Sequence, residues 1–194
     1  MLHMPKILSR GLTVISFFAQ LTFVLVFFYF LAPIYYFFQA FQGNMASDIL
    51  KSDDFLLVPN HSHISQALIN QFPEYIYAIL MSIGVILATI SILYELRALI
   101  KIISNLGQKK YFTAENVKLV RLFIVSQIYT LACDPFLAGA NQLSTSYLGR
   151  VNNGTFNATW SNIPDDLITL IIIGVIYILF KLAEQMKRES DLTV

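Results

Sequence analysis

Cys133 and Asp134 are neighbouring reactive side chains inside an otherwise apolar stretch of this chain. A cysteine thiol becomes an effective nucleophile when a positioned base takes its proton. The stretch contains no histidine, and the sequence has no second cysteine that could form a thiol pair. Nucleophilic catalysis and thiol oxidoreduction are therefore not favoured, and we expect the protein not to be an enzyme.

A row of polar residues leads up to Asp134. Gln127, Thr130 and Asp134 recur at intervals of three and four, so they lie on one arc of a helix. An ionisable side chain within a membrane helix indicates function by default. Two interpretations remain open. One is an interfacial carboxylate with a polar seam that holds neighbouring helices together, and the other is a ligand- or proton-sensing site that opens outward.

His61 and His63 are the other residues with ligand chemistry. They are two positions apart, so an extended backbone places both on one side, where Asp53 or Asp54 could join them around a metal ion. The motif lacks a defined third ligand, and the alternative is a polar loop with two exposed histidines. No histidine lies in an apolar stretch, which argues against a bis-histidine haem. We predict no metal and no cofactor.

The elements that must position these residues are apolar helices. Hydrophobic residues make up 56% and charged residues 13% of the 194 positions, whereas a soluble domain carries about 25% charged residues. Four stretches are long enough to cross a bilayer, which takes about 20 apolar residues: 12–38, 75–94, 119–139 and 167–183. We predict an all-α integral membrane bundle of four transmembrane helices, forming a single domain over residues 1–194. The first stretch exceeds the about 7–15 residues of a signal-peptide core, so we expect it to be retained.

Basic residues give this bundle an orientation. Of the 13 Lys and Arg residues, only Lys51 and Arg150 lie in the connections 41–73 and 140–163. Cytoplasmic connections carry the excess of Lys and Arg in membrane proteins. We therefore predict both termini in the cytoplasm and these two connections on the outer face. A net charge of +1 provides no field that would bind nucleic acid directly.

The connection between the second and third helices has recognisable end signals. We expect the second helix to run past the bilayer into the cytoplasm as ELRALIKIISNL and to stop at Gly107, since glycine suits a helix C-terminus. Thr113 is the expected N-cap of the third helix, with Glu115 in its first turn. The apolar residues of the extension recur at helical spacing, so they require a headgroup layer, another helix or a partner protein to cover them.

The chain ends on KLAEQMKRESDLTV, where basic residues follow the last apolar run. Lysines and arginines near anionic lipid contribute about 1 kcal/mol each to membrane binding. Lipid attraction accounts for the basic residues but not for Glu115, Asn116, Glu189 or Asp191. The final LTV is β-prone and could add to an edge strand or fill a groove, in this protein or in a partner. Lipid anchoring with self-docking and docking of a partner both remain open.

Two segments carry a recognisable pattern. In LGQKKYFTAENVKLVRLF the positions that carry it are Gly107, Phe112, Thr113, Asn116 and Arg121. In the closing segment they are Glu189, Asp191, Leu192, Thr193 and Val194. The pattern resembles the bacterial four-helix membrane family catalogued as domain of unknown function 2975. The resemblance brings no established activity. It implies a location in the bacterial cytoplasmic membrane and a gene that lies beside a small helix-turn-helix regulator.

These observations favour a regulatory or sensory membrane protein whose cytoplasmic face docks a partner, such as a small helix-turn-helix DNA-binding regulator. The docking residues predicted on that face are Phe112, Thr113, Glu115, Asn116, Arg121, Glu189, Asp191, Leu192, Thr193 and Val194. The lipid bilayer is the other expected partner, and the chain could form a homo-oligomer. The alternative is a transport or export subunit, or a membrane immunity protein, which would act as an oligomer because four helices are few for a transporter.

Overall fold

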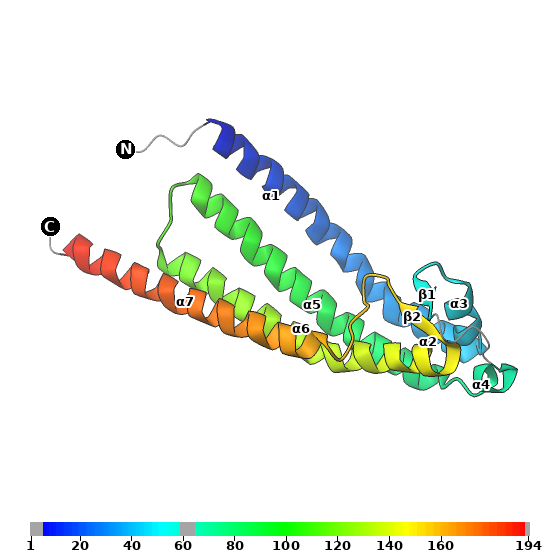
Figure 1. Cartoon of the computed structure of the whole chain (residues 1–194). Helices are drawn as coiled ribbons and strands as arrows, with labels where there is room; N and C mark the ends of the chain where they lie inside the picture. The colour runs from blue at the N-terminus through cyan, green and yellow to red at the C-terminus, as the bar shows by residue number, and fades with distance from the viewer. Residues whose placement is uncertain (1–5, 59–64, 193–194) are drawn as a thin grey trace. The chain divides into compact units, whose positions relative to one another are not determined.

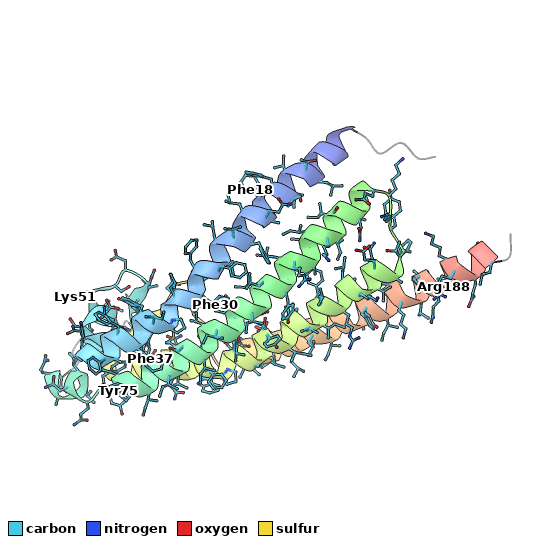
Figure 2. The ribbon with its side chains drawn as sticks, turned by 180° about the vertical axis from the view of Figure 1, so that it is seen from behind. Phe18, Phe30, Phe37, Lys51, Tyr75 and Arg188 are labelled. Carbon is cyan, nitrogen blue, oxygen red and sulfur yellow. The ribbon has the colours of Figure 1, made fainter. Side chains whose placement is uncertain are left out.

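The computed structural model of the chain describes residues 6–58 and 65–192 and consists mainly of helices (Figure 1). Four helical segments are long and apolar enough to cross a membrane: Gly11–Gln42, Glu74–Gly107, Ala114–Leu148 and Asn162–Ser190. The four predicted apolar helices are confirmed, and each is longer than its predicted stretch. Large apolar side chains such as Phe18 and Phe37 remain exposed (Figure 2), as is typical of surfaces that meet lipid.

The first apolar segment is interrupted by a change of helix type. α1 (Lys6–Val26) is followed by a 3-10 helix, η1 (Phe27–Leu31), and then by α2 (Ala32–Gln42). Pro33 lies at the start of α2. In a continuous α-helix its ring would collide with the carbonyl of Tyr29, and it has no N–H to donate. The tighter 3-10 turn accommodates the proline without ending the apolar segment.

α2 ends at Gln42 and is capped by Gly43, whose φ of 69° is a left-handed conformation that glycine adopts without a side-chain penalty. The N–H groups of Gly43 and Asn44 donate to the carbonyls of Ala40 and Gln39, at 3.2 and 3.0 Å. These two bonds satisfy carbonyls that the helix end leaves free. The chain turns back here and begins α3 (Met45–Lys51).

The connection 41–73, predicted as an outer loop, contains further regular structure besides α3. β1 (Phe55–Leu57) and α4 (Gln66–Asn70) both form within it. The side chain of Ser65 caps α4 by accepting the backbone N–H of Leu68 at 3.4 Å, a role for which serine is favoured.

α5 (Glu74–Gly107) ends at the predicted glycine. The helix therefore includes the whole predicted extension beyond the second apolar stretch. After a short connection, Thr113 Oγ1 accepts the backbone N–H of Asn116 at 3.3 Å. This bond confirms the predicted N-cap of the next helix.

α6 (Ala114–Leu148) is longer than the sequence predicted. The third helix was expected to end near Gly139, but it continues to Leu148 with Pro135 inside it. Prolines are tolerated within membrane helices when neighbouring groups satisfy the freed carbonyl. The helix therefore continues from the predicted span into the predicted connection 140–163.

β2 (Arg150–Asn152) pairs antiparallel with β1 in the register Phe55↔Asn152, Leu56↔Val151 and Leu57↔Arg150. This two-stranded ribbon joins the connections 41–73 and 140–163. The all-α prediction holds for the architecture of the four long helices but missed the ribbon. α7 (Asn162–Leu192) follows, and no residue of its most apolar window is buried.

Contacts divide the chain into two compact units. The loop unit comprises residues 28–89 and 129–166, and the terminal unit comprises the described parts of 1–27, 90–128 and 167–194. α5 and α6 are each divided between the two units, with one part in the loop unit and the other in the terminal unit. The loop unit has a continuous hydrophobic core, in which the largest fully buried side chains include Met45, Ile49, Tyr77 and Leu148.

Candidate functional site

The position of α3 in the loop unit is fixed by a carboxylate from another helix. Asn44 precedes α3 without providing a side-chain cap. Glu74, the first residue of α5, accepts the backbone N–H groups of Met45 at 3.3 Å and Ala46 at 3.5 Å. These are donors that a helix start leaves free, and the negative charge suits the positive end of the helix dipole. Glu74 therefore ties α3 to the beginning of a long helix.

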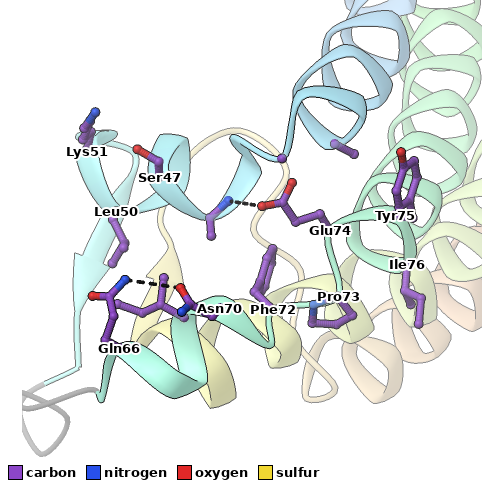
Figure 3. A pocket seen from close by; sticks show the side chains of 14 residues that line it. Ser47, Leu50, Lys51, Gln66, Asn70, Phe72, Pro73, Glu74, Tyr75 and Ile76 are labelled. Carbon is purple, nitrogen blue, oxygen red and sulfur yellow. Dashed lines mark hydrogen bonds between the residues drawn. The ribbon is translucent and has the colours of Figure 1, made fainter.

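One side of α3 borders an open groove of about 920 Å³. Figure 3 shows that α3 contributes Ser47, Leu50 and Lys51 to it, while α4 contributes Gln66 and Asn70. The side chains of the two α4 residues are joined by a hydrogen bond of 3.3 Å. The remaining lining is largely apolar and includes Phe72, Pro73 and Ile76. Apolar walls with a few polar groups are typical of ligand pockets.

A different face of α3 lines a smaller cavity of about 230 Å³. The cavity combines aromatic rings, among them Tyr36 and Tyr77, with the carboxylates of Asp48 and Asp54. Asp48 Oδ2 accepts the hydroxyl of Tyr35 at 2.7 Å. This arrangement gives the loop unit an acidic, aromatic recess.

The aromatic residues of this recess were not predicted from the sequence. Tyr29 and Tyr36 both line it, and their spacing of seven, close to two helical turns, was the signal that could have drawn attention to them. Asp54 was considered only as a partner of His61 and His63. Those two histidines lie outside the described residues. Within 6–58 and 65–192, no group of three or more metal-binding side chains occurs.

Asp134 lies on α6 in the loop unit and is 3% exposed. The Cys133 thiol, also buried, is 4.0 Å from Asp134 Oδ1. Within the described chain, Asp134 Oδ2 has no hydrogen-bond donor, and the side chain of Asp166, near the start of α7, is its neighbour. Two carboxylates repel each other when both are ionised, so a sensing role for this pair would need a third group between them and stays a prediction.

The other two residues of the predicted polar seam lie on the same helix. Gln127 is buried, and its Oε1 has no donor within the described residues. Thr130 is half-buried. Thr130 and Asp134 belong to the loop unit, whereas Gln127 belongs to the terminal unit. The seam as a helix-joining or sensing feature stays a prediction.

The α5–α6 connection in the terminal unit is organised around Asn116. Asn116 is 2% exposed. Its Oδ1 accepts a hydrogen bond of 2.7 Å from Asn105 Nδ2, and its Nδ2 donates to the carbonyls of Lys110 and Tyr111. A buried amide with its groups paired in this way fixes the backbone around it. Asn116 therefore shapes the connection from within, while its side chain is withdrawn from the surface.

The other predicted docking residues around this connection are more accessible. Glu115 and Arg121 are exposed, and Thr113 is half-buried. Phe112 is 45% exposed, and its ring lies 5.8 Å from that of Phe180, centroid to centroid. The ring contact places the connection against α7.

The charged end of α7 is largely accessible. Glu189 is exposed, and Arg188 Nε lies 3.9 Å from Glu184 Oε1, the pairing expected for residues four apart on a helix. Leu192 is 84% exposed and is the last residue of α7, so the docking predicted for LTV stays a prediction. Asp191 is also helical. Thr193 and Val194 lie outside the described residues.

Comparisons with models of known protein families, with curated proteins and with solved structures find no match to this chain.

Proposed function

We propose that the chain is a non-enzymatic regulatory or sensory protein of the bacterial cytoplasmic membrane. It crosses the bilayer four times as a helical bundle, with both termini in the cytoplasm. The loop unit then faces outward and receives a signal, and the terminal unit presents a docking surface to a cytoplasmic partner. The distribution of Lys and Arg between connections supports this orientation.

The observation that carries the proposal is the joining of two sequence-distant segments in the terminal unit. The contact of Phe112 with Phe180 brings the α5–α6 connection against α7. Glu115 and Arg121 are exposed near that connection, and Glu189 and Leu192 are exposed at the end of α7. Lipid attracts basic side chains, but it gives no reason for exposed acidic residues here. A protein surface of complementary charge does.

The partner that we propose is a small helix-turn-helix regulator encoded beside this chain. Its basis is the resemblance carried by Phe112, Asn116 and the closing residues. Binding to a membrane protein would hold such a regulator away from DNA, and release would return it. In this proposal, the signal received on the outer face determines whether the partner stays bound on the cytoplasmic face.

The orientation predicts the location of reporters fused to the chain. A fluorescent protein that matures only in the cytoplasm, placed after Val194, is expected to fluoresce, and alkaline phosphatase there is expected to be inactive. The same phosphatase placed after Gln71, with the chain truncated at that point, is expected to be active because the preceding connection is then periplasmic. The reverse pattern at both positions would contradict the orientation.

Docking predicts that a charge reversal on the terminal unit releases the partner. The double variant Glu115→Lys and Glu189→Lys is expected to lower recovery of the co-expressed neighbouring regulator by about tenfold, since rim charges govern association. The measurement is affinity purification from membranes, with both proteins quantified. The control is Asp53→Lys with Asp165→Lys, two exposed residues outside the recess, which changes net charge equally in the loop unit. Equal recovery with both double variants, or no recovery with the unmodified chain, would count against docking.

A further inference from the structure

The small cavity of the loop unit is large enough for an organic ligand. Its volume is about 230 Å³, whereas a cavity of about 150 Å³ accommodates benzene. Its walls come from η1, α2, α3, α5, β1 and the segment after β2. A recess built from so many elements is defined by the fold of the whole unit rather than by one mobile side chain.

Aromatic rings form much of the wall. Tyr29 and Phe156 meet edge to face with their ring centroids 5.0 Å apart, which fixes both rings. Tyr77 is 1% exposed and provides a buried surface. Tyr36 and Phe55 complete the set. The faces of aromatic rings carry partial negative charge and attract cations, organic ammonium groups above all.

Two carboxylates add full negative charge. Asp48 is oriented by the hydroxyl of Tyr35. Asp54 lies beside Gly154, where a Cβ added to the glycine would be 3.4 Å from the Asp54 Cβ and Cγ. Within the described chain, neither carboxylate lies within ion-pair distance of a basic side chain. Among the residues 6–58 and 65–192, the charge at the cavity therefore has no basic side chain as a counter-ion.

The charge and the rings together select the kind of ligand. A calcium or magnesium ion would need about six oxygen ligands, whereas the described residues contain no group of three or more His, Cys, Asp or Glu side chains that could hold one. A neutral aromatic molecule would fill the volume but would provide no positive charge opposite the two carboxylates. An organic cation satisfies both features, because its apolar groups contact the rings and its charge is met by the carboxylates.

We propose that the recess between α3, α5 and the strand ribbon binds a small organic ammonium ion. The ammonium group lies against the rings of Tyr36 and Tyr77, within the field of Asp48 and Asp54. The inference rests on the proposed function, since it names the chemical class of the signal that the loop unit receives. The ammonium group could belong to a free solute or to a lipid headgroup.

Calorimetry on the purified full chain tests the proposal in maltoside detergent with choline and tetramethylammonium as probes. Both are expected to bind saturably. Dimethylbutanol, in which carbon replaces the charged nitrogen of choline, is expected to bind at least about tenfold more weakly. Equal affinity for choline and its neutral analogue, or no binding of either ammonium probe, overturns the proposal.

Matched variants test the residues. Asp48→Asn and Asp54→Asn are each expected to weaken choline binding about tenfold, whereas Asp53→Asn, which removes an exposed neighbouring charge, leaves it within about twofold. Tyr36→Phe keeps the ring face and is expected to bind normally, while Tyr36→Leu is expected to lose affinity. A loss with Asp53→Asn equal to that with Asp54→Asn would sink the proposed site.

Two further experiments are needed. One distinguishes a free solute from a lipid headgroup as the source of the ammonium group, and the other tests the recess separately from the proposed function. If the ligand is a lipid headgroup, free choline is expected to bind more weakly in phosphatidylcholine nanodiscs than in phosphatidylglycerol nanodiscs. If the ligand is a free solute, choline is expected to bind equally in both. Either result supports the recess. The Glu115→Lys and Glu189→Lys double variant is expected to bind choline normally. If the unmodified chain binds choline but does not recover the regulator, the proposed function alone fails. If it recovers the regulator but does not bind choline, the recess alone fails.

Discussion

Replacing Gly84 with leucine is expected to prevent stable folding of the loop unit. Gly84 lies on α5 beside Leu137 of α6, and a Cβ at position 84 would be 2.6 Å from Leu137 Cγ and 3.3 Å from its backbone nitrogen. Small residues allow membrane helices to approach in this way. Gly84→Ala is expected to cost about 1–3 kcal/mol, the range for overpacking a tight core, and leucine more.

The measurement is the temperature at which the detergent-solubilised protein loses its monodisperse elution. Gly139→Ala is the matched control, because the nearest atom to a Cβ added at position 139 is Leu80 Cδ1 at 3.5 Å, an ordinary van der Waals contact. We expect the control to match the unmodified chain and Gly84→Leu to elute as aggregate. A Gly84→Leu protein as heat-resistant as the control would show that the two helices do not approach closely there.

Replacing Asn116 with alanine is expected to loosen the α5–α6 connection. The change removes the acceptor of Asn105 Nδ2 and the donor to the carbonyls of Lys110 and Tyr111. Asn105 is 7% exposed, so its amide is left buried without this partner, a loss of about 1–3 kcal/mol. The two carbonyls belong to exposed residues and can bind water instead.

Hydrogen exchange resolves this effect by segment. Amides over residues 105–116 are expected to exchange faster in Asn116→Ala, and those of the β1–β2 ribbon to remain unchanged. Glu115→Ala is the control, because it removes an exposed side chain one position away and should leave exchange unaltered. Similar exchange in the two variants would mean that the Asn116 amide does not hold the connection.

Local signals were sufficient to predict the long helices and several of their ends. Hydropathy over about 20 residues identifies membrane-crossing helices because lipid demands it of every such segment. Gly107 and Thr113 end and begin helices through their own backbone and side-chain chemistry. Local signals do not predict how Pro33 and Pro135 affect their helices. The helix type changes before Pro33, whereas Pro135 lies within α6, and the neighbours that decide between these outcomes are remote in sequence.

The candidate sites depended still more on distant contacts. Glu74 reaches the start of α3 across 29 positions, and the recess collects rings from elements spread over much of the chain. The spacing of residues within a short segment does not predict contacts between segments so far apart in the sequence. Asn116 was predicted as a docking residue. Its structural role depends on its hydrogen bond with Asn105, eleven positions earlier.

The pairing of β1 with β2 also constrains how the protein is made. β1 precedes α5 and β2 follows α6, and the guanidinium of Arg150 reaches the carbonyl of Phe55 across 95 positions. During synthesis, β1 emerges long before its partner strand exists, and closing so long a loop is entropically costly and slow. Until α6 has left the ribosome, β1 therefore has an unpaired edge, which promotes aggregation. During this interval, chaperones and quality-control proteases have access to the nascent chain.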